Sequence, residues 1–149
     1  MKNETTERIK HLLEEVIELL SEIDKPEQFD FGEGLVNAHR HVNPDDTVGG
    51  WVADTAYVSK TAYIGPEAQV SGEARVFGKA WVSDKARVSG EARVSGEAKV
   101  FGGAYVSDQA RVYDEAKVSG KTQVFGEARI SGRTRVCNEA RGLRLSKIS

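Results

Sequence analysis

Histidine and arginine are the residues of this chain whose chemistry is most readily put to use. Imidazole titrates near neutral pH and can serve as a general base or a metal ligand, and guanidinium groups bind anions. His39 and His41 occur in the segment AHRHV, and they would face the same side of an extended strand. Copies of the chain around a threefold axis would gather these imidazoles, so His39 and His41 are candidate metal ligands. The alternative is that they pack over the first coil of the fold. No other metal, cofactor or catalytic residue is expected.

A second set of candidates is a row of arginines spaced by eighteen residues: Arg75, Arg93, Arg111 and Arg129. Glu73, Glu91 and Glu127 stand two residues before three of them and would lie on the same face. Such exposed pairs contribute about 0.2–1 kcal/mol each, which favours a solvated face whose charges compensate one another. The alternative is that the row binds an anion or a nucleic acid.

Large aromatic residues also recur at outward positions, and exposed aromatics often mark contact with another protein. The candidates are Trp51, Tyr63, Trp81 and Tyr105. The alternative is that their rings only cover neighbouring strands.

An internal repeat defines the elements that position these side chains. A β-branched residue recurs every six positions from Val52 to Val136 without a gap, and a small residue, usually Ala, stands two positions before it. In the segment EARVS the Ala and Val face one side, which predicts a half-buried strand of about five residues. The sixth position must bend the chain, and it is usually Gly, Asp or Asn, which tolerate a positive φ. Strands joined by such bends wind into a solenoid whose coils stack at about 4.8 Å.

The hexads VSGEAR and VFGKAW resemble the hexapeptide repeat of left-handed parallel β-helices, in which an aliphatic residue is followed four positions later by a small one. The resemblance covers residues 50–139, and three hexads per coil imply five triangular coils. It implies a mainly β, left-handed parallel β-helix and a homotrimer. The chain is similar in this respect to bacterial and phage proteins whose rods act as scaffolds or recognition surfaces.

The enzymes of this superfamily rely on histidine. Its acyltransferases use one in a cleft between subunits, and its carbonic anhydrases hold zinc with three. The repeat contains no His and no inserted loop. We therefore favour a non-catalytic structural or protein-binding role. The alternative is an acyltransferase that uses His39 or His41 at a subunit boundary.

The segment TTERIKHLLEEVIELLSEI predicts an amphipathic helix from about Thr5 to Ile23, capped by Thr5 or Thr6 and ended by Pro26. Its apolar residues form an a/d seam with extra members: Ile9, Leu12, Leu13, Val16, Leu19, Leu20 and Ile23. A short helix with this much apolar surface must bury it. We expect it to join copies of the chain, with capping of the first coil or recognition of another protein as alternatives.

These patterns divide the chain into four segments. Residues 1–25 form the helix, 26–49 a linker that caps the first coil, 50–141 the β-helix and 142–149 a C-terminal cap or tail. The net charge of −2 gives no reason to expect nucleic-acid or membrane binding, and no apolar run is long enough to span a bilayer. Cys137 is the only cysteine, which fits a reducing compartment and a cytoplasmic protein.

Overall fold

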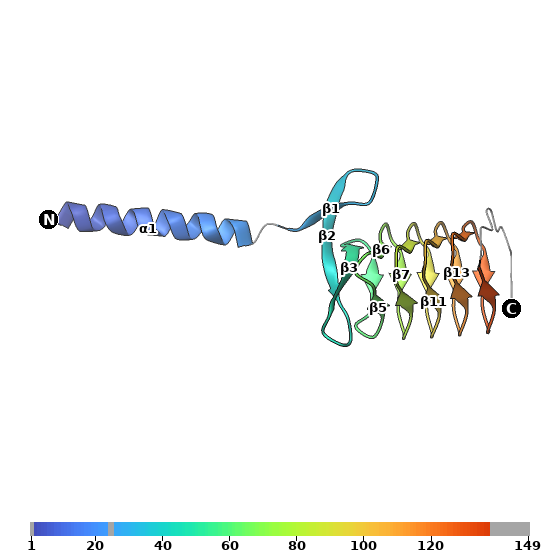
Figure 1. The fold of residues 1–149 in the computed structure, drawn as a ribbon. Coiled ribbons are helices and arrows are strands. Elements are labelled where there is room, and N and C mark those ends of the chain that lie inside the picture. Colours follow the sequence, from blue (N-terminus) through green and yellow to red (C-terminus); the bar gives the residue numbers. More distant parts are fainter. Residues whose placement is uncertain (1, 24–25, 138–149) are drawn as a thin grey trace.

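The computed structural model describes residues 2–23 and 26–137 and consists of one helix followed by a parallel β-solenoid (Figure 1). Helix α1 spans Lys2–Ile23 and lies beyond the N-terminal end of the solenoid. The predicted mainly β fold, with about five solenoid turns and an N-terminal helix, is confirmed. The left-handed sense stays a prediction from the resemblance.

The β part begins with three longer strands, which form the N-terminal edge of the first coil. They are β1 (Gln28–Asp30), β2 (Leu35–Val42) and β3 (Val48–Ala53). Strand β1 pairs antiparallel with β2, and β2 pairs antiparallel with β3. The predicted linker is therefore a folded hairpin that lies against the first strand of the solenoid.

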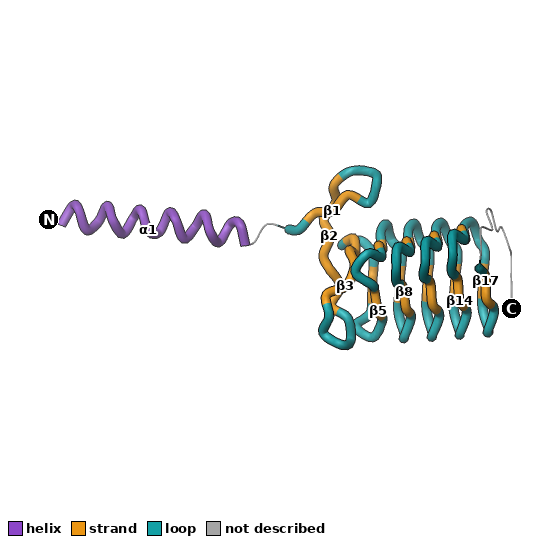
Figure 2. Tube along the Cα trace, viewed as in Figure 1, coloured by secondary structure: helices purple, strands orange, loops and turns teal. Residues whose placement is uncertain are grey.

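The remaining strands are two residues long and belong to three sheets, which are the faces of the solenoid. Figure 2 shows these short strands separated by turns along the coils. One face continues from β3 through β6 (Gln69–Val70), β9 (Arg87–Val88), β12 (Tyr105–Val106) and β15 (Gln123–Val124). The second comprises β4 (Tyr57–Val58), β7 (Arg75–Val76), β10 (Arg93–Val94), β13 (Arg111–Val112) and β16 (Arg129–Ile130). The third comprises β5 (Tyr63–Ile64), β8 (Trp81–Val82), β11 (Lys99–Val100), β14 (Lys117–Val118) and β17 (Arg135–Val136).

Each strand pairs in parallel with the strand eighteen residues later, so equivalent residues stack in columns. Arg93 pairs with Arg75 on one side and Arg111 on the other, and Val94 pairs with Val76 and Val112. The interior holds the aliphatic and small residues of the repeat, and Val82 and Ala92 are typical in being fully buried. The predicted division into an inward Ala/Val pair and outward polar residues is confirmed.

The strands are shorter than the predicted five residues because each bend takes more than one residue. In a typical bend the carbonyl of Ser71 accepts the N–H of Ala74 at 3.3 Å, which places Gly72 and Glu73 at the centre of a turn. The first central residue has φ of +62° at Gly72, and every equivalent position in steps of six up to Gly132 also has a positive φ. The repeated Gly or Asp is therefore required by the left-handed backbone of the turn.

The aspartates at these turn positions have an additional role. The Oδ2 atoms of Asp84, Asp108 and Asp114 each accept the N–H of the glycine one coil later, at 3.0–3.1 Å. Asp and Asn adopt positive φ more readily than most residues with a side chain. The hydrogen bond to the next coil offsets part of the remaining backbone strain.

We predict that Gly96→Ala destabilises the solenoid by about 1–2 kcal/mol, because φ is +65° there and an added Cβ would lie 3.0 Å from the Asp114 nitrogen. Gly103→Ala is the matched control. It lies in the next bend but one residue further along the turn, outside the positive-φ set, and its added Cβ meets no atom closer than 3.5 Å. Urea denaturation of both variants measures the difference. Equal destabilisation would show that the turn geometry is not the cause.

Candidate functional site

His39 and His41 lie in β2 but make contacts with different groups. The Nδ1 atom of His39 is 2.9 Å from the Oδ1 atom of Asp54, and both side chains are about half exposed, at 53%. His41 is 7% exposed, and its Nε2 donates to the carbonyl of Ala62 at 2.9 Å. A register shift between Arg40 and Val42 interrupts the regular alternation of β2. Because of its bond to the Ala62 carbonyl, the Nε2 of His41 is already occupied by a backbone partner.

The backbone edge of the first coil is satisfied by side chains of the hairpin. In later coils the equivalent backbone groups bond to the preceding coil. For example, the carbonyl of Val82, which is equivalent to Ile64, accepts the N–H of Gly65. In the first coil the Oδ1 of Asn43 accepts the N–H of Ile64 at 2.8 Å, and its Nδ2 donates to the Ile64 carbonyl at 3.1 Å. Together with His41, Asn43 replaces the missing coil beneath β5. Sequence reasoning placed the histidines over the first coil but missed Asn43.

Trp51 is part of this same cap and is partly buried. Its ring stacks on Phe29 of β1 with centroids 5.0 Å apart, and the Arg40 guanidinium lies 5.4 Å from its centroid. Arg40 also donates to the carbonyls of Gly49 and Pro66, which ties the hairpin to the first coil. Trp51 therefore packs within the cap, which agrees with the alternative that its ring covers neighbouring strands.

The arginine row forms one column of the second face, as the spacing predicts. Arg75, Arg93, Arg111 and Arg129 line a groove of about 570 Å³ together with Glu73, Glu91, Gln109 and Glu127. Within residues 2–23 and 26–137, no carboxylate lies within 4.0 Å of an arginine of this row. The expected direct ion pairs are therefore not formed, although both charges line one groove and offset each other through solvent. Anion binding by this row stays a prediction.

The third face carries an aromatic pair. Tyr63 and Trp81 are stacked at 3.8 Å between ring centroids with an angle of 16° between the rings, and Trp81 is 41% exposed. They line an open groove of about 830 Å³ with the turns that follow β5 and β8. Their strands lie next to each other in the sheet, so the column spacing brings the two rings into contact.

Tyr105 lies on the first face, where its hydroxyl accepts a hydrogen bond from Ser89 at 2.9 Å. A further groove of about 840 Å³ separates this tyrosine and its neighbouring turns from the β1–β2 loop. In that loop Asp30 accepts the N–H groups of Gly32 and Gly34, and these bonds lower the pKa of its carboxyl group. The loop is therefore held in a fixed shape above the groove.

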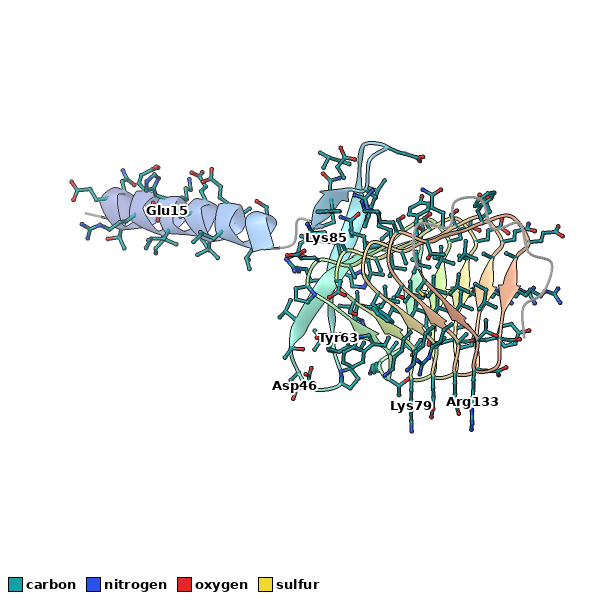
Figure 3. The ribbon with its side chains drawn as sticks, turned by 45° about the vertical axis from the view of Figure 1, so that its right-hand side comes forward. Glu15, Asp46, Tyr63, Lys79, Lys85 and Arg133 are labelled. Atoms are coloured by element: carbon teal, nitrogen blue, oxygen red, sulfur yellow. The ribbon has the colours of Figure 1, made fainter. Side chains whose placement is uncertain are left out.

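Helix α1 extends further towards the N-terminus than expected, so Thr5 and Thr6 lie within it and do not cap it. Every residue from Asn3 to Ser21 is exposed, and the apolar side chains are 50–64% exposed: Ile9, Leu12, Leu13, Val16, Ile17, Leu19 and Leu20. Figure 3 shows side chains, among them that of Glu15, projecting from a helix separate from the coils. In the described part of the chain nothing buries the apolar face. The predicted C-terminal cap at 142–149 lies outside the described residues.

The described residues can also be assessed for a metal site and for a membrane-spanning helix. No group of three His, Cys, Asp or Glu side chains is placed to hold a metal ion among the residues described, so His39 and His41 would need ligands from elsewhere. No described helix is long and apolar enough to cross a membrane.

The comparison with protein families gives one match. A model described as the YdcK beta solenoid repeat matches residues 68–84, which correspond to about one coil. No curated protein matches the chain. No solved structure matches it either. The match and the fold together support a β-solenoid built as a structural scaffold.

Asn43→Ala is expected to lower the free energy of unfolding by about 2–4 kcal/mol, because it leaves the buried N–H and carbonyl of Ile64 without partners. The control is Asn37→Ala, which removes only an exposed contact to Gln28 and should cost less than about 1 kcal/mol. Urea denaturation compares the two. A similar small loss in both would mean that water replaces the Asn43 side chain at no cost.

The stability of the chain should decrease as the pH falls below about 6.5, since burial lowers the pKa of His41 from the unfolded value of 6.5. The unfolded chain then binds a proton before the folded chain does, and the loss levels off once the pH passes the folded-state pKa. His41→Gln keeps a donor for the Ala62 carbonyl but does not titrate, so its stability should vary less over this range. His11→Gln, on the exposed helix, should retain the wild-type profile. Urea midpoints at neutral pH and at about pH 5 test this, and identical profiles for His41→Gln and wild type would contradict it.

Proposed function

We propose that this chain is a non-catalytic, self-assembling scaffold in which α1 joins copies and the solenoid presents rigid surfaces to a protein partner. The observation that carries the proposal is the apolar face of α1, which is exposed along its whole described length. Helices of this length are marginal in water unless tertiary contacts bury their apolar face. A second copy of the same helix is a partner that every chain supplies.

The positions of the apolar residues support association in register. Ile9 and Val16 take a positions and Leu12 and Leu19 take d positions of a heptad. β-branched residues at a with Leu at d favour two strands in a parallel coiled coil. Leu13 and Leu20 at e positions widen the apolar face beyond a two-stranded seam, because an e residue is flanked by a third helix only in a larger bundle. We therefore propose a homotrimer.

The histidine contacts favour this role over the acyltransferase alternative. A general base must reach the substrate proton, and the Nε2 of His41 is buried against Ala62. His39 remains accessible next to Asp54, but it is not among the residues that line the three grooves described above. The accessible features of the solenoid are grooves along its faces, which suit recognition of an extended surface.

Sedimentation analysis and native mass spectrometry of the full chain should give a trimer at micromolar concentration. Leu19→Glu should shift it to monomer, because three charged side chains would be buried in the seam. Ser21→Glu adds the same charge at an f position, which faces away from the seam, and should remain trimeric. A monomeric wild type would overturn the proposal, and a dimer would overturn its stoichiometry while retaining self-association.

A further inference from the structure

One turn position distinguishes the third face from the rest of the solenoid. The second central residue of each turn, from Glu67 to Arg133 in steps of six, is Glu, Lys, Gln or Arg with one exception, which is Gly103. In its column Gly103 lies between Lys85 of the preceding coil and Lys121 of the next. The missing side chain leaves a notch at this corner, and backbone strain does not require the glycine, because Gly103 lies outside the positive-φ set. The glycine, and with it the notch, is therefore not imposed by the backbone geometry of the turn.

The notch opens onto the aromatic pair. Gly103, Lys85, Lys121 and the exposed ring of Trp81 all line the same groove of about 830 Å³. That volume lies within the range of about 300–1,000 Å³ typical of small-ligand sites. The groove thus combines an exposed apolar ring with two ammonium groups.

The charges of this corner are available to a ligand. Within the described residues no carboxylate lies within 4.0 Å of the ammonium groups of Lys85 or Lys121. Two carboxylates, those of Glu67 and Asp84, also line the groove, and the Oδ2 of Asp84 accepts the N–H of Gly102 at 3.1 Å. The column above Trp81 continues with Lys99 and Lys117 and adds positive charge along the same face. The two carboxylates and two ammonium groups of the groove lining balance in number, so the excess positive charge of this face comes from Lys99 and Lys117.

We propose that this groove binds an acidic oligosaccharide, with one sugar ring packed on Trp81 and its carboxylate or sulfate groups at Lys85 and Lys121. Aromatic rings offer a flat apolar surface to the C–H face of a sugar, and ammonium groups attract its anions. The column of lysines would meet further acidic groups along a chain lying parallel to the solenoid axis. The scaffold of the previous subsection is not required for this binding.

Two other anionic ligands fit less well. Single-stranded nucleic acid stacks successive bases on successive aromatics, whereas the column changes from Trp81 to Lys99 after one exposed ring. An acidic peptide would gain affinity by adding a strand to a free sheet edge. Strand β8 is already paired with β5 and β11 on its two sides, so it offers no such edge.

The test is calorimetric titration of the full-length protein with an oligogalacturonate, with its methyl ester as the uncharged probe. We expect saturable binding of the acid, with affinity at least about tenfold higher than that of the ester, equivalent to about 1.4 kcal/mol. Gly103→Glu fills the notch and places a carboxylate between Lys85 and Lys121, and it should weaken binding at least tenfold. Gln109→Glu is the matched control, since it adds the same charge at the equivalent position of the next turn and should bind as wild type does.

Gly103→Gln separates shape from charge, because it fills the notch without a carboxylate, and it should also weaken binding. An added Cβ at position 103 meets no atom closer than 3.5 Å, so these variants should keep the wild-type unfolding midpoint. Absence of binding at millimolar oligogalacturonate overturns the proposal, as does equal weakening by Gln109→Glu. Binding of oligothymidylate that displaces the oligogalacturonate would instead assign the groove to nucleic acid.

Discussion

The parallel hydrogen bonding of each coil to the next, in a register of eighteen residues, is the constraint on which the rest of this structure depends. It places identical backbone positions about 4.8 Å apart, so a residue type repeated in the sequence becomes a column in space. Inside, the columns are mainly Ala and Val, which form one buried cluster because each coil repeats the same two side chains. Outside, the same register builds columns of charged residues. Some are of one sign, such as the row from Arg75 to Arg129, whereas the corner from which Lys79 and Arg133 extend (Figure 3) also carries Glu115, which pairs with Arg133 at 3.1 Å.

A stack of this kind has an end where the register finds no partner. The first coil would expose the Ala62 carbonyl and both backbone groups of Ile64, and unpaired strand edges invite aggregation. His41 and Asn43 satisfy these groups with side chains, and β2 pairs with β3 through its backbone. The hairpin is therefore a cap assembled from two kinds of hydrogen bond. Burial of a neutral imidazole at this point makes the cap sensitive to acid.

The helix and the solenoid follow different physical requirements. The solenoid buries the Ala and Val residues of its repeat within one chain, whereas α1 leaves its apolar face exposed. Assembly through α1 would place several solenoids side by side, each carrying its own groove at Trp81. Several weak contacts to one polymeric ligand then act together, because the second contact is intramolecular with a high effective concentration. Each site needs only modest affinity in such an arrangement.

The repeat of six was enough to predict the solenoid, the inward Ala and Val residues and the outward columns, because these follow from strand alternation and turn chemistry within one hexad. The heptad spacing of the N-terminal apolar residues likewise predicted the apolar face of α1, which depends only on helical period. The length of the strands was overestimated, since the turn consumes two central residues that the alternation alone does not reveal. Three features depend on contacts between distant segments and on side-chain conformation: the role of Asn43, the packing of Trp51 against Phe29, and the lack of ion pairs along the row from Arg75 to Arg129 within the described residues. Only the tertiary structure decides these, and it also shows that the missing side chain of Gly103 lies beside an exposed ring, because that proximity arises from stacking of coils.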